Sequence, residues 1–173
     1  MIHPDMPRAR ISLATVAIAP ELLELQKLCF QEEAEANHEF NIPPLTQSVE
    51  NLREEFRIHT VLAAWHRQWL VGSVRGRREG PVCHISRLIV HPDHRNQGLG
   101  TALMAAIEDA FRGVSSYELF TGERSERNLR LYTGLGYVPV RREQVTPRLT
   151  LVHLQKRRAG RELVASLSTP PFG

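Results

Sequence analysis

Residues 95–101, with the sequence RNQGLGT, lie between a run of strand-forming residues and a helical pattern. Gly98 and Gly100 carry no Cβ, so the main chain there can approach a ligand closely. The first amides of a helix attract anions, and Arg95 adds a charged donor that suits phosphate. The segment therefore predicts a strand, a phosphate-binding turn and a helix in succession.

Two well-known glycine loops do not fit this segment. A dinucleotide fingerprint needs a third glycine three residues after Gly100, but Leu103 occupies that position. A nucleoside-triphosphate loop needs Gly-Lys-Ser/Thr, whereas Thr101 and Ala102 follow Gly100. The first fingerprint is therefore excluded, and triphosphate hydrolysis loses its main support.

The rest of the chain alternates between helical and strand signals. Apolar residues recur at helical spacing in some segments, and β-branched or aromatic runs mark others. The expected order is strand, helix, helix, three strands, helix, strand, helix and two strands, over residues 11–15, 20–39, 49–56, 60–65, 69–75, 82–90, 99–110, 117–121, 125–135, 137–140 and 149–154. Residues 41–47 are predicted as a loop, and the irregular pattern of 82–90 indicates a bulge or splay. This order predicts an α+β fold with a mixed sheet.

Length and composition fit one domain. Of the 173 residues, 42% are hydrophobic and 24% charged, as in an average soluble domain. We expect a single domain over residues 1–156 and a loosely packed or partner-dependent tail over 157–173. No apolar stretch approaches the ~18 residues of a spanning helix, and the two distant cysteines predict no disulfide framework. We expect a cytoplasmic protein with reduced thiols.

Three segments of the chain resemble the GNAT superfamily of N-acetyltransferases. The family signature, Arg/Gln-x-x-Gly-x-Gly/Ala after the fourth strand, is matched by residues 95–100. Residues 88–92 (LIVHP) are similar to the strand and turn before it, and residues 128–137 (NLRLYTGLGY) to a second family segment. The resemblance covers residues 11–154. It implies a three-layer α/β arrangement of the α+β class, with a largely antiparallel, twisted sheet of about seven strands that is flanked by helices and splayed between the fourth and fifth strands.

The resemblance also implies acetyl transfer from acetyl-CoA to a primary amine, by direct attack in a ternary complex. Backbone groups near Leu88 and Val90 would pair with the pantetheine arm, and an amide at Ile89 or Val90 would polarise the thioester carbonyl. The residues expected to bind the cofactor are Leu88, Ile89, Val90, Arg95, Asn96, Gln97, Gly98, Leu99, Gly100, Thr101, Asn128 and Tyr132.

The resemblance suggests a general acid but leaves the base open. Tyr132 matches the family tyrosine that protonates the departing sulfur, and Asn128, one helical turn earlier, could bind the pantetheine or a water. His84, Glu123 and Glu39 are candidates for the base, because members of the family differ in the residue that removes the proton. The competing interpretations are a core tyrosine, a surface histidine and solvated carboxylates.

Other charged patterns carry less weight. A solvated helix face explains four glutamates of the first predicted helix better than attraction of a cationic amine does; these are Glu32, Glu33, Glu35 and Glu39. The 22 Lys and Arg residues barely outnumber the 19 Asp and Glu, which does not favour nucleic-acid binding. A tight turn accounts for His91, Asp93 and His94 better than a metal site does.

We therefore expect acetyl-CoA and an amine acceptor as partners, with no metal, nucleic acid or membrane. A homodimer is left open. The alternatives are a noncatalytic CoA-binding regulatory module, and an enzyme whose acceptor is a protein or peptide amine rather than a small molecule.

Overall fold

The computed structural model describes residues 8–158 of the chain. Its elements are β1 (Arg10–Leu13), α1 (Ala19–Asn37), α2 (Pro43–Thr46), α3 (Val49–Glu55), β2 (Thr60–His66), β3 (Trp69–Glu79), β4 (Val82–Val90), α4 (Leu99–Ala110), β5 (Ser116–Gly122), α5 (Glu126–Gly134), β6 (Val138–Thr146) and β7 (Leu149–Arg157). Apart from α2, the order is the predicted one. The prediction of a loop over residues 41–47 was wrong for the α2 residues, since proline's fixed φ suits the first turn of a helix.

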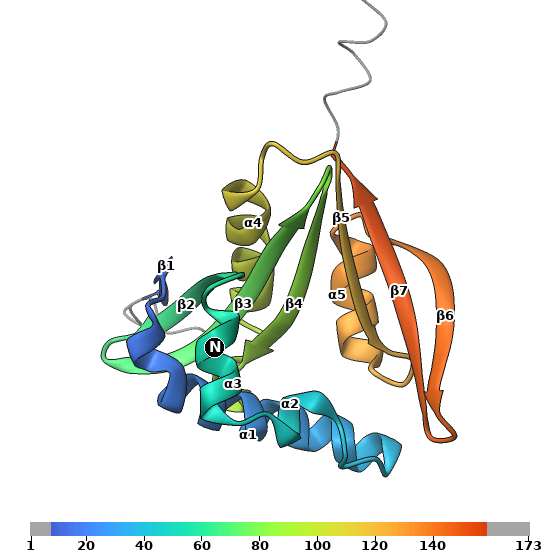
Figure 1. Cartoon of the computed structure of the whole chain (residues 1–173), viewed down its shortest axis with the longest axis horizontal. Helices are drawn as coiled ribbons and strands as arrows, with labels where there is room; N and C mark the ends of the chain where they lie inside the picture. Colours follow the sequence, from blue (N-terminus) through green and yellow to red (C-terminus); the bar gives the residue numbers. More distant parts are fainter. Residues whose placement is uncertain (1–7, 159–173) are drawn as a thin grey trace, which may run out of the picture.

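All seven strands form one sheet in the order β1-β2-β3-β4-β5-β7-β6. Neighbouring strands are antiparallel except β4 and β5, which are parallel. Figure 1 shows β4 and β5 close together at one end and diverging toward the other, where α1 lies. The predicted mixed, largely antiparallel sheet with a splay between its fourth and fifth strands is therefore confirmed.

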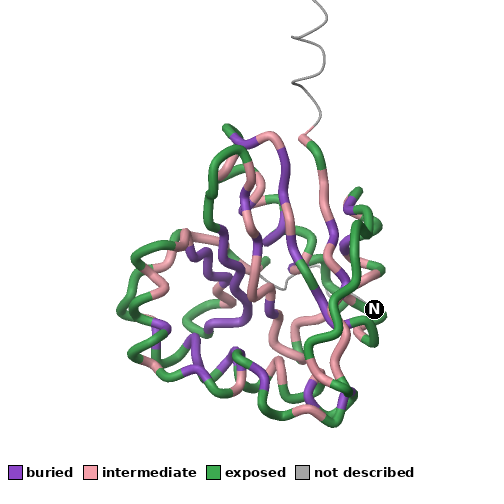
Figure 2. Tube along the Cα trace, turned by 45° about the vertical axis from the view of Figure 1, so that its right-hand side comes forward, coloured by how far each residue is buried: buried purple, intermediate pink, exposed green. Residues whose placement is uncertain are grey.

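Helices cover both faces of the sheet. On one face, α4 and α5 contribute Leu103, Ile107 and Tyr132 to a buried cluster. On the other, α1 and α3 contribute Leu22 and Leu52 to a second cluster. Because successive side chains of a strand point to opposite faces, neighbouring residues of β2 enter different clusters. Buried residues accordingly follow the inner strands and the inward faces of the helices (Figure 2).

A β-bulge in β4 confirms the irregularity predicted over 82–90. The pairing with β3 shifts register between Ser73 and Arg75, and Arg87 has a left-handed φ of 53°. A bulge bends its strand and redirects side chains, often beside an active site. Here it falls where β4 leaves β5.

A buried arginine ties the helical face to the sheet. Arg75 of β3 is 1% exposed, and its guanidinium donates to the Glu55 carboxylate and to the Gln26 side-chain oxygen. Removing one partner from such a buried pair leaves the other uncompensated and strongly destabilises a fold. This network therefore joins α1 and α3 to the middle of the sheet.

The C-terminal strands run further than predicted. β6 continues through Thr146 and β7 through Arg157, because the two strands pair along most of their length as a hairpin. Most of the tail predicted over residues 157–173 lies outside the described residues. Among residues 8–158, no helix combines the length and apolar character needed to cross a membrane.

Tight packing of α4 on β3 predicts opposite effects at two glycines. A Cβ on Gly76 would lie 2.6 Å from Phe111 Cε2 and 3.0 Å from Ile107 Cγ1, whereas Gly134 has no atom within 4 Å of that position. We expect Gly76→Ala to lower the free energy of unfolding by about 1–3 kcal/mol, the usual cost of overpacking. Gly134→Ala, the control, should leave it unchanged or raise it by up to about 1 kcal/mol. Urea denaturation measures both, and equal stability of the two variants would refute this account of the packing.

Candidate functional site

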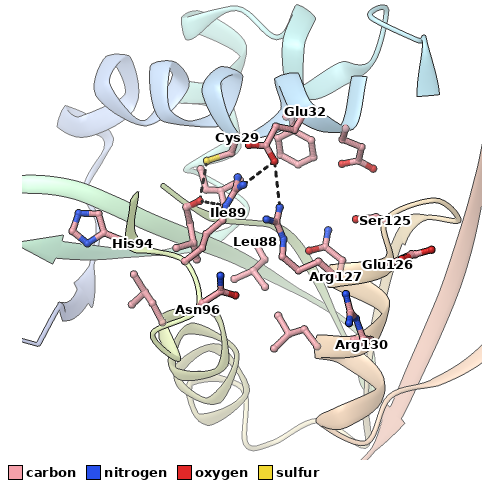
Figure 3. Close-up of a pocket in the computed structure, with 18 of the residues that line it drawn as sticks. Cys29, Glu32, Leu88, Ile89, His94, Asn96, Ser125, Glu126, Arg127 and Arg130 are labelled. Atoms are coloured by element: carbon pink, nitrogen blue, oxygen red, sulfur yellow. Dashed lines mark hydrogen bonds and ion pairs between the residues drawn. The ribbon is translucent and has the colours of Figure 1, made fainter. Parts of the chain in front are cut away.

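A cavity of about 730 Å³ opens where β4 and β5 part. Its walls come from α1, the end of β4, the turn before α4 and the first turn of α5 (Figure 3). This volume lies within the usual range for small-molecule and cofactor sites. The predicted cofactor residues that line it are Leu88, Ile89, Val90, Arg95, Asn96, Gly98, Leu99, Gly100, Thr101 and Asn128.

The parting of the strands exposes a backbone edge to this cavity. β4 and β5 pair only from Val82 to His84, opposite Ser116 to Glu118. Further along, the Val90 carbonyl accepts hydrogen bonds from Cys29 Sγ (3.4 Å) and Arg95 Nε (3.1 Å) rather than from a neighbouring strand. Because the amide and carbonyl of a strand residue share one edge, the Val90 amide faces the same gap. An extended ligand can therefore pair with β4 here.

The turn before α4 ends in an uncapped helix N-terminus. Gly98 is the N-cap with a φ of 79°, and a Cβ there would meet nothing within 4 Å. No side chain caps the helix, its first turn holds no acidic residue, and the Ala102 amide makes the first helical bond, to Gly98 (3.0 Å). The preceding amides keep their donors free beside the cavity, where the helix dipole favours negative charge. The predicted phosphate turn thus has the geometry of an anion site.

Among residues 8–158, four arginines line the cavity, and one glutamate forms ion pairs with two of them. Glu32 of α1 reaches across the cavity to Arg95 (2.8 Å) and to Arg127 of α5 (3.7 Å), as Figure 3 shows. Arg130 and Arg124 also line the cavity. Arginine binds phosphate through paired, planar donors. The charge of this end of the cavity suits a phosphorylated ligand.

The next residue of α1, Glu33, lies in a different environment. It is half-buried, and a Cβ on Gly122 would stand 2.8 Å from its Oε1, so only glycine at this end of β5 allows the approach. Burial raises the pKa of Glu33, although a hydrogen bond from the Gly122 backbone and the charge of Arg87 act in the opposite direction. Glu33 is thus a desolvated carboxylate in the wall of the cavity.

Tyr132 is buried and is not among the residues that line the cavity. Its ring is 6% exposed and packs edge-on against Tyr137, with ring centroids 6.0 Å apart. Burial raises the pKa of Tyr132, and the negative charge of Glu33 acts in the same direction. Asn128 donates to Thr121 Oγ1 (3.3 Å), which fixes the first turn of α5 against β5.

The structure does not bring the other predicted residues to the cavity. His84 lies where β4 and β5 are still paired and faces Glu79 (3.3 Å) and Glu118 (3.8 Å). Glu123 faces Arg142 of β6 (3.4 Å), and Gln97 is exposed in the turn. The catalytic roles of His84 and Glu123 and the cofactor contact of Gln97 stay predictions, and these positions do not favour them.

Sequence reasoning missed Glu33 because it treated the glutamates of α1 as one solvated face. A signal was available in the polar residues Gln26, Glu33 and Asn37, which recur every three or four positions with Phe30 among them. Such a stripe lies on one side of a helix, and Gln26 and Asn37 are both buried. Polar residues at the spacing expected for buried helix positions therefore indicated which side of α1 faces the protein interior and the site.

Comparison with known proteins agrees with this geometry. Residues 19–137 match the model of the acetyltransferase (GNAT) family. The chain belongs to that family. It is 28% identical over 121 residues to the UPF0157 protein YqkA of Bacillus subtilis, a match that covers 69% of this chain but only 34% of that protein.

Solved structures of GNAT proteins share the fold. The PaiA N-acetyltransferase of Thermoplasma acidophilum, in complex with coenzyme A, has a TM-score of 0.73 and 14% identity, over 88% of this chain and 100% of that one. YncA of Salmonella typhimurium, a putative acetyltransferase with its cofactor acetyl-CoA, has a TM-score of 0.69 and 18% identity, over 87% and 94%. At these identities the likeness concerns the fold.

The gap between α4 and α5 predicts the effect of a side chain at Gly100. A Cβ there would lie 3.4 Å from Leu131 Cδ2, an ordinary contact, so Gly100→Leu should fold normally while filling the space beside the free amides. We expect the dissociation constant for CoA, measured by titration calorimetry, to rise at least tenfold, by about 1.4 kcal/mol or more. Ala105→Leu, exposed on the same helix, is the matched control. Unchanged CoA affinity in the Gly100 variant would exclude the turn as the anion site.

Proposed function

We propose that this chain transfers an acetyl group from acetyl-CoA to a primary amine of a small molecule or peptide, by direct attack in a ternary complex. The observation that carries the proposal is the unpaired edge of β4 leading to the free first-turn amides of α4. An extended arm with a phosphate group at its end matches that combination. When bound, acetyl-CoA supplies an activated acetyl thioester.

Residues of the cavity wall would hold this cosubstrate. The edge at Leu88 and Val90 would pair with the pantetheine arm, while the amides of residues 98–101 and Arg95 would bind the pyrophosphate. The Val90 amide would donate to the negative charge that develops on the carbonyl oxygen. Arg95 and Arg127 are already turned toward this region by Glu32.

Glu33 is the general base in this proposal. An attacking amine must lose a proton, and a base works best when its pKa is close to the working pH. Burial raises the pKa of Glu33, and the carboxylate interacts with both Arg87 of β4 and Tyr132 of α5. Tyr132, whose raised pKa keeps it protonated, would give its proton to the departing sulfur.

A covalent route through cysteine is disfavoured. Burial raises the pKa of Cys29 to about 11, which keeps the one cysteine that lines the cavity in its thiol form. The thiolate is the nucleophilic form. Cys29 and Cys83 are both free thiols, which agrees with the proposed cytoplasmic location.

The proposal is tested by incubating the purified protein with acetyl-CoA and pooled amines. Free CoA thiol and product mass are followed together, with a control that contains no amine. Thiol release coupled to the mass gain of one acetyl group establishes the reaction. CoA binding without transfer to any amine would favour the noncatalytic regulatory module, and lack of CoA binding would overturn the assignment. Gel filtration of the same sample measures whether the protein is a homodimer.

Replacing the proposed base should remove one limb of the pH profile. Because the base acts when ionised and its pKa is raised, the wild-type kcat/KM should fall as pH drops through a value above the ordinary 4.5 of a glutamate. Glu33→Gln should lose this limb and lower kcat/KM by about 10²–10⁴-fold. Glu35→Gln on the exposed side of α1 is the matched control. A Glu33 variant that keeps the wild-type profile would exclude it as the base.

Replacing the proposed acid should act on turnover alone. Tyr132→Phe keeps the ring packed against Tyr137 but removes the hydroxyl proton. We expect kcat to fall about 10²-fold or more, with little change in CoA affinity and with the Glu33 limb retained. Steady-state kinetics and calorimetry measure these effects, and full activity would show that Tyr132 is a packing residue only.

A further inference from the structure

A second cavity, of about 360 Å³, lies on the α2 and α3 side of β4. It is lined by Asn41, Pro43, Thr46, Gln47, Asn51, Glu55 and Arg87. Its volume is near the lower end of the range for small-molecule sites. Most of its wall is polar, so its occupant is a small polar molecule.

Several polar side chains of this wall already have partners. Gln47 accepts from Gln26 (3.0 Å) and donates to Asn51 (2.8 Å), and the Glu55 carboxylate is taken by Arg75. The side chain of Arg87 forms no hydrogen bond or ion pair with any other residue of the described range 8–158. Arg87 Nε is buried without an acceptor in that range. The guanidinium lies 5.9 Å from the centroid of the Phe30 ring and is near enough to the carboxylates of Glu33 and Glu55 to interact with their charge, but it forms an ion pair with neither.

This arrangement is costly unless something pairs with Arg87. A buried donor without an acceptor destabilises a fold, and buried polar groups nearly always find partners. The backbone of Arg87 also has the left-handed φ of the β4 bulge, a conformation that residues other than glycine rarely adopt. Strain and an unpaired charge at one residue, in the wall of a cavity, point to a ligand group that Arg87 binds.

The charges around Arg87 define that group. Glu55 is already neutralised by Arg75, and the remaining lining side chains are uncharged, so Arg87 supplies the net positive charge of the cavity. A guanidinium binds a carboxylate, as it binds a phosphate, through two parallel hydrogen bonds, and a carboxylate is the smaller of the two groups. On its other side Arg87 interacts with Glu33, and its partner Phe30 lines the first cavity. Arg87 therefore lies between the second cavity and the proposed base.

We propose that the acceptor is a small amino acid, whose carboxylate is bound by Arg87 while its amine reaches Glu33. The inference rests on the proposed acetyl transfer and specifies its substrate class. The amine loses its proton to Glu33, its nitrogen forms the bond to the acetyl carbon, and the thioester bond breaks with CoA as the leaving group. The carboxylate takes no part in the bond changes and serves to orient the molecule.

Matched pairs of acceptors test the proposal. Glycine, β-alanine and the common L-amino acids are each assayed beside the corresponding carboxamide, which keeps the amine and removes the charge. We expect kcat/KM for the preferred amino acid to exceed that of its carboxamide at least tenfold. Arg87→Gln should abolish this preference, because it lowers the value for the amino acid by more than the value for the carboxamide, and Arg87→Lys should restore part of it. The ratio of the two values is the readout, since loss of the Arg87 charge raises the pKa of Glu33 for both acceptors alike. Arg77→Gln on the exposed part of β3 should leave both values unchanged.

Separate measurements distinguish loss of the carboxylate site from misfolding and from loss of the transfer activity. The CoA affinity of Arg87→Gln should match that of the wild type, and its unfolding temperature should be equal or higher, because the substitution removes a buried guanidinium that has no partner among the described residues. Equal transfer to carboxamides and amino acids, or a preference that survives in Arg87→Gln, overturns the carboxylate site while leaving the acetyltransferase proposal intact. Activity confined to peptides overturns the small-molecule acceptor. If no amine is acetylated, the amino acids are titrated into the protein alone. Binding to the wild type that is lost in Arg87→Gln supports the carboxylate site even without transfer. Absence of binding to the wild type refutes the carboxylate site.

Discussion

The early separation of β4 from β5 is the constraint on which the site depends. Parallel strands normally satisfy their backbone groups by pairing along their length, yet these two pair over three residues only. The unpaired edge of β4 is left facing a cavity instead of a neighbour, and residues of α1 and of the first turns of α4 and α5 form the other walls of this cavity. The sheet thus provides backbone donors and acceptors that a ligand can use.

Helix α1 contributes side chains with different roles to the cavity between β4 and β5. Glu32 stays at the surface, where it holds arginines of the turn and of α5, whereas Glu33 is turned inward and loses water. Adjacent residues of a helix point about 100° apart, which is why two neighbouring glutamates have different surroundings. Cys29 and Phe30 fill the space between them and β4.

Two arginines on neighbouring strands show how partners decide a role. Arg75 is more deeply buried than Arg87, but its charge is met by Glu55 and its remaining donors in part by Gln26. It is a structural residue that joins helices to the sheet. Arg87 has no such partner and lies in a cavity wall. The two side chains have the same chemistry. Their surroundings differ, and this difference makes Arg75 part of a structural ion pair and Arg87 a candidate ligand-binding residue.

The sequence alone determined the features that depend on nearby residues. The strand, glycine turn and helix over 82–110 are visible because spacing and the special conformation of Gly98 are local properties, and the order of elements follows from local periodicity. For the same reason most of the predicted cofactor residues line the cavity, since nine of the ten that do so lie within residues 88–101. Tertiary structure decided the rest: the inward position of Glu33 at Gly122, the absence of His84 and Glu123 from the cavity lining, and the guanidinium of Arg87 without an ion-pair partner among the described residues. These depend on contacts between segments far apart in the chain, and burial and charge compensation arise only when such segments meet.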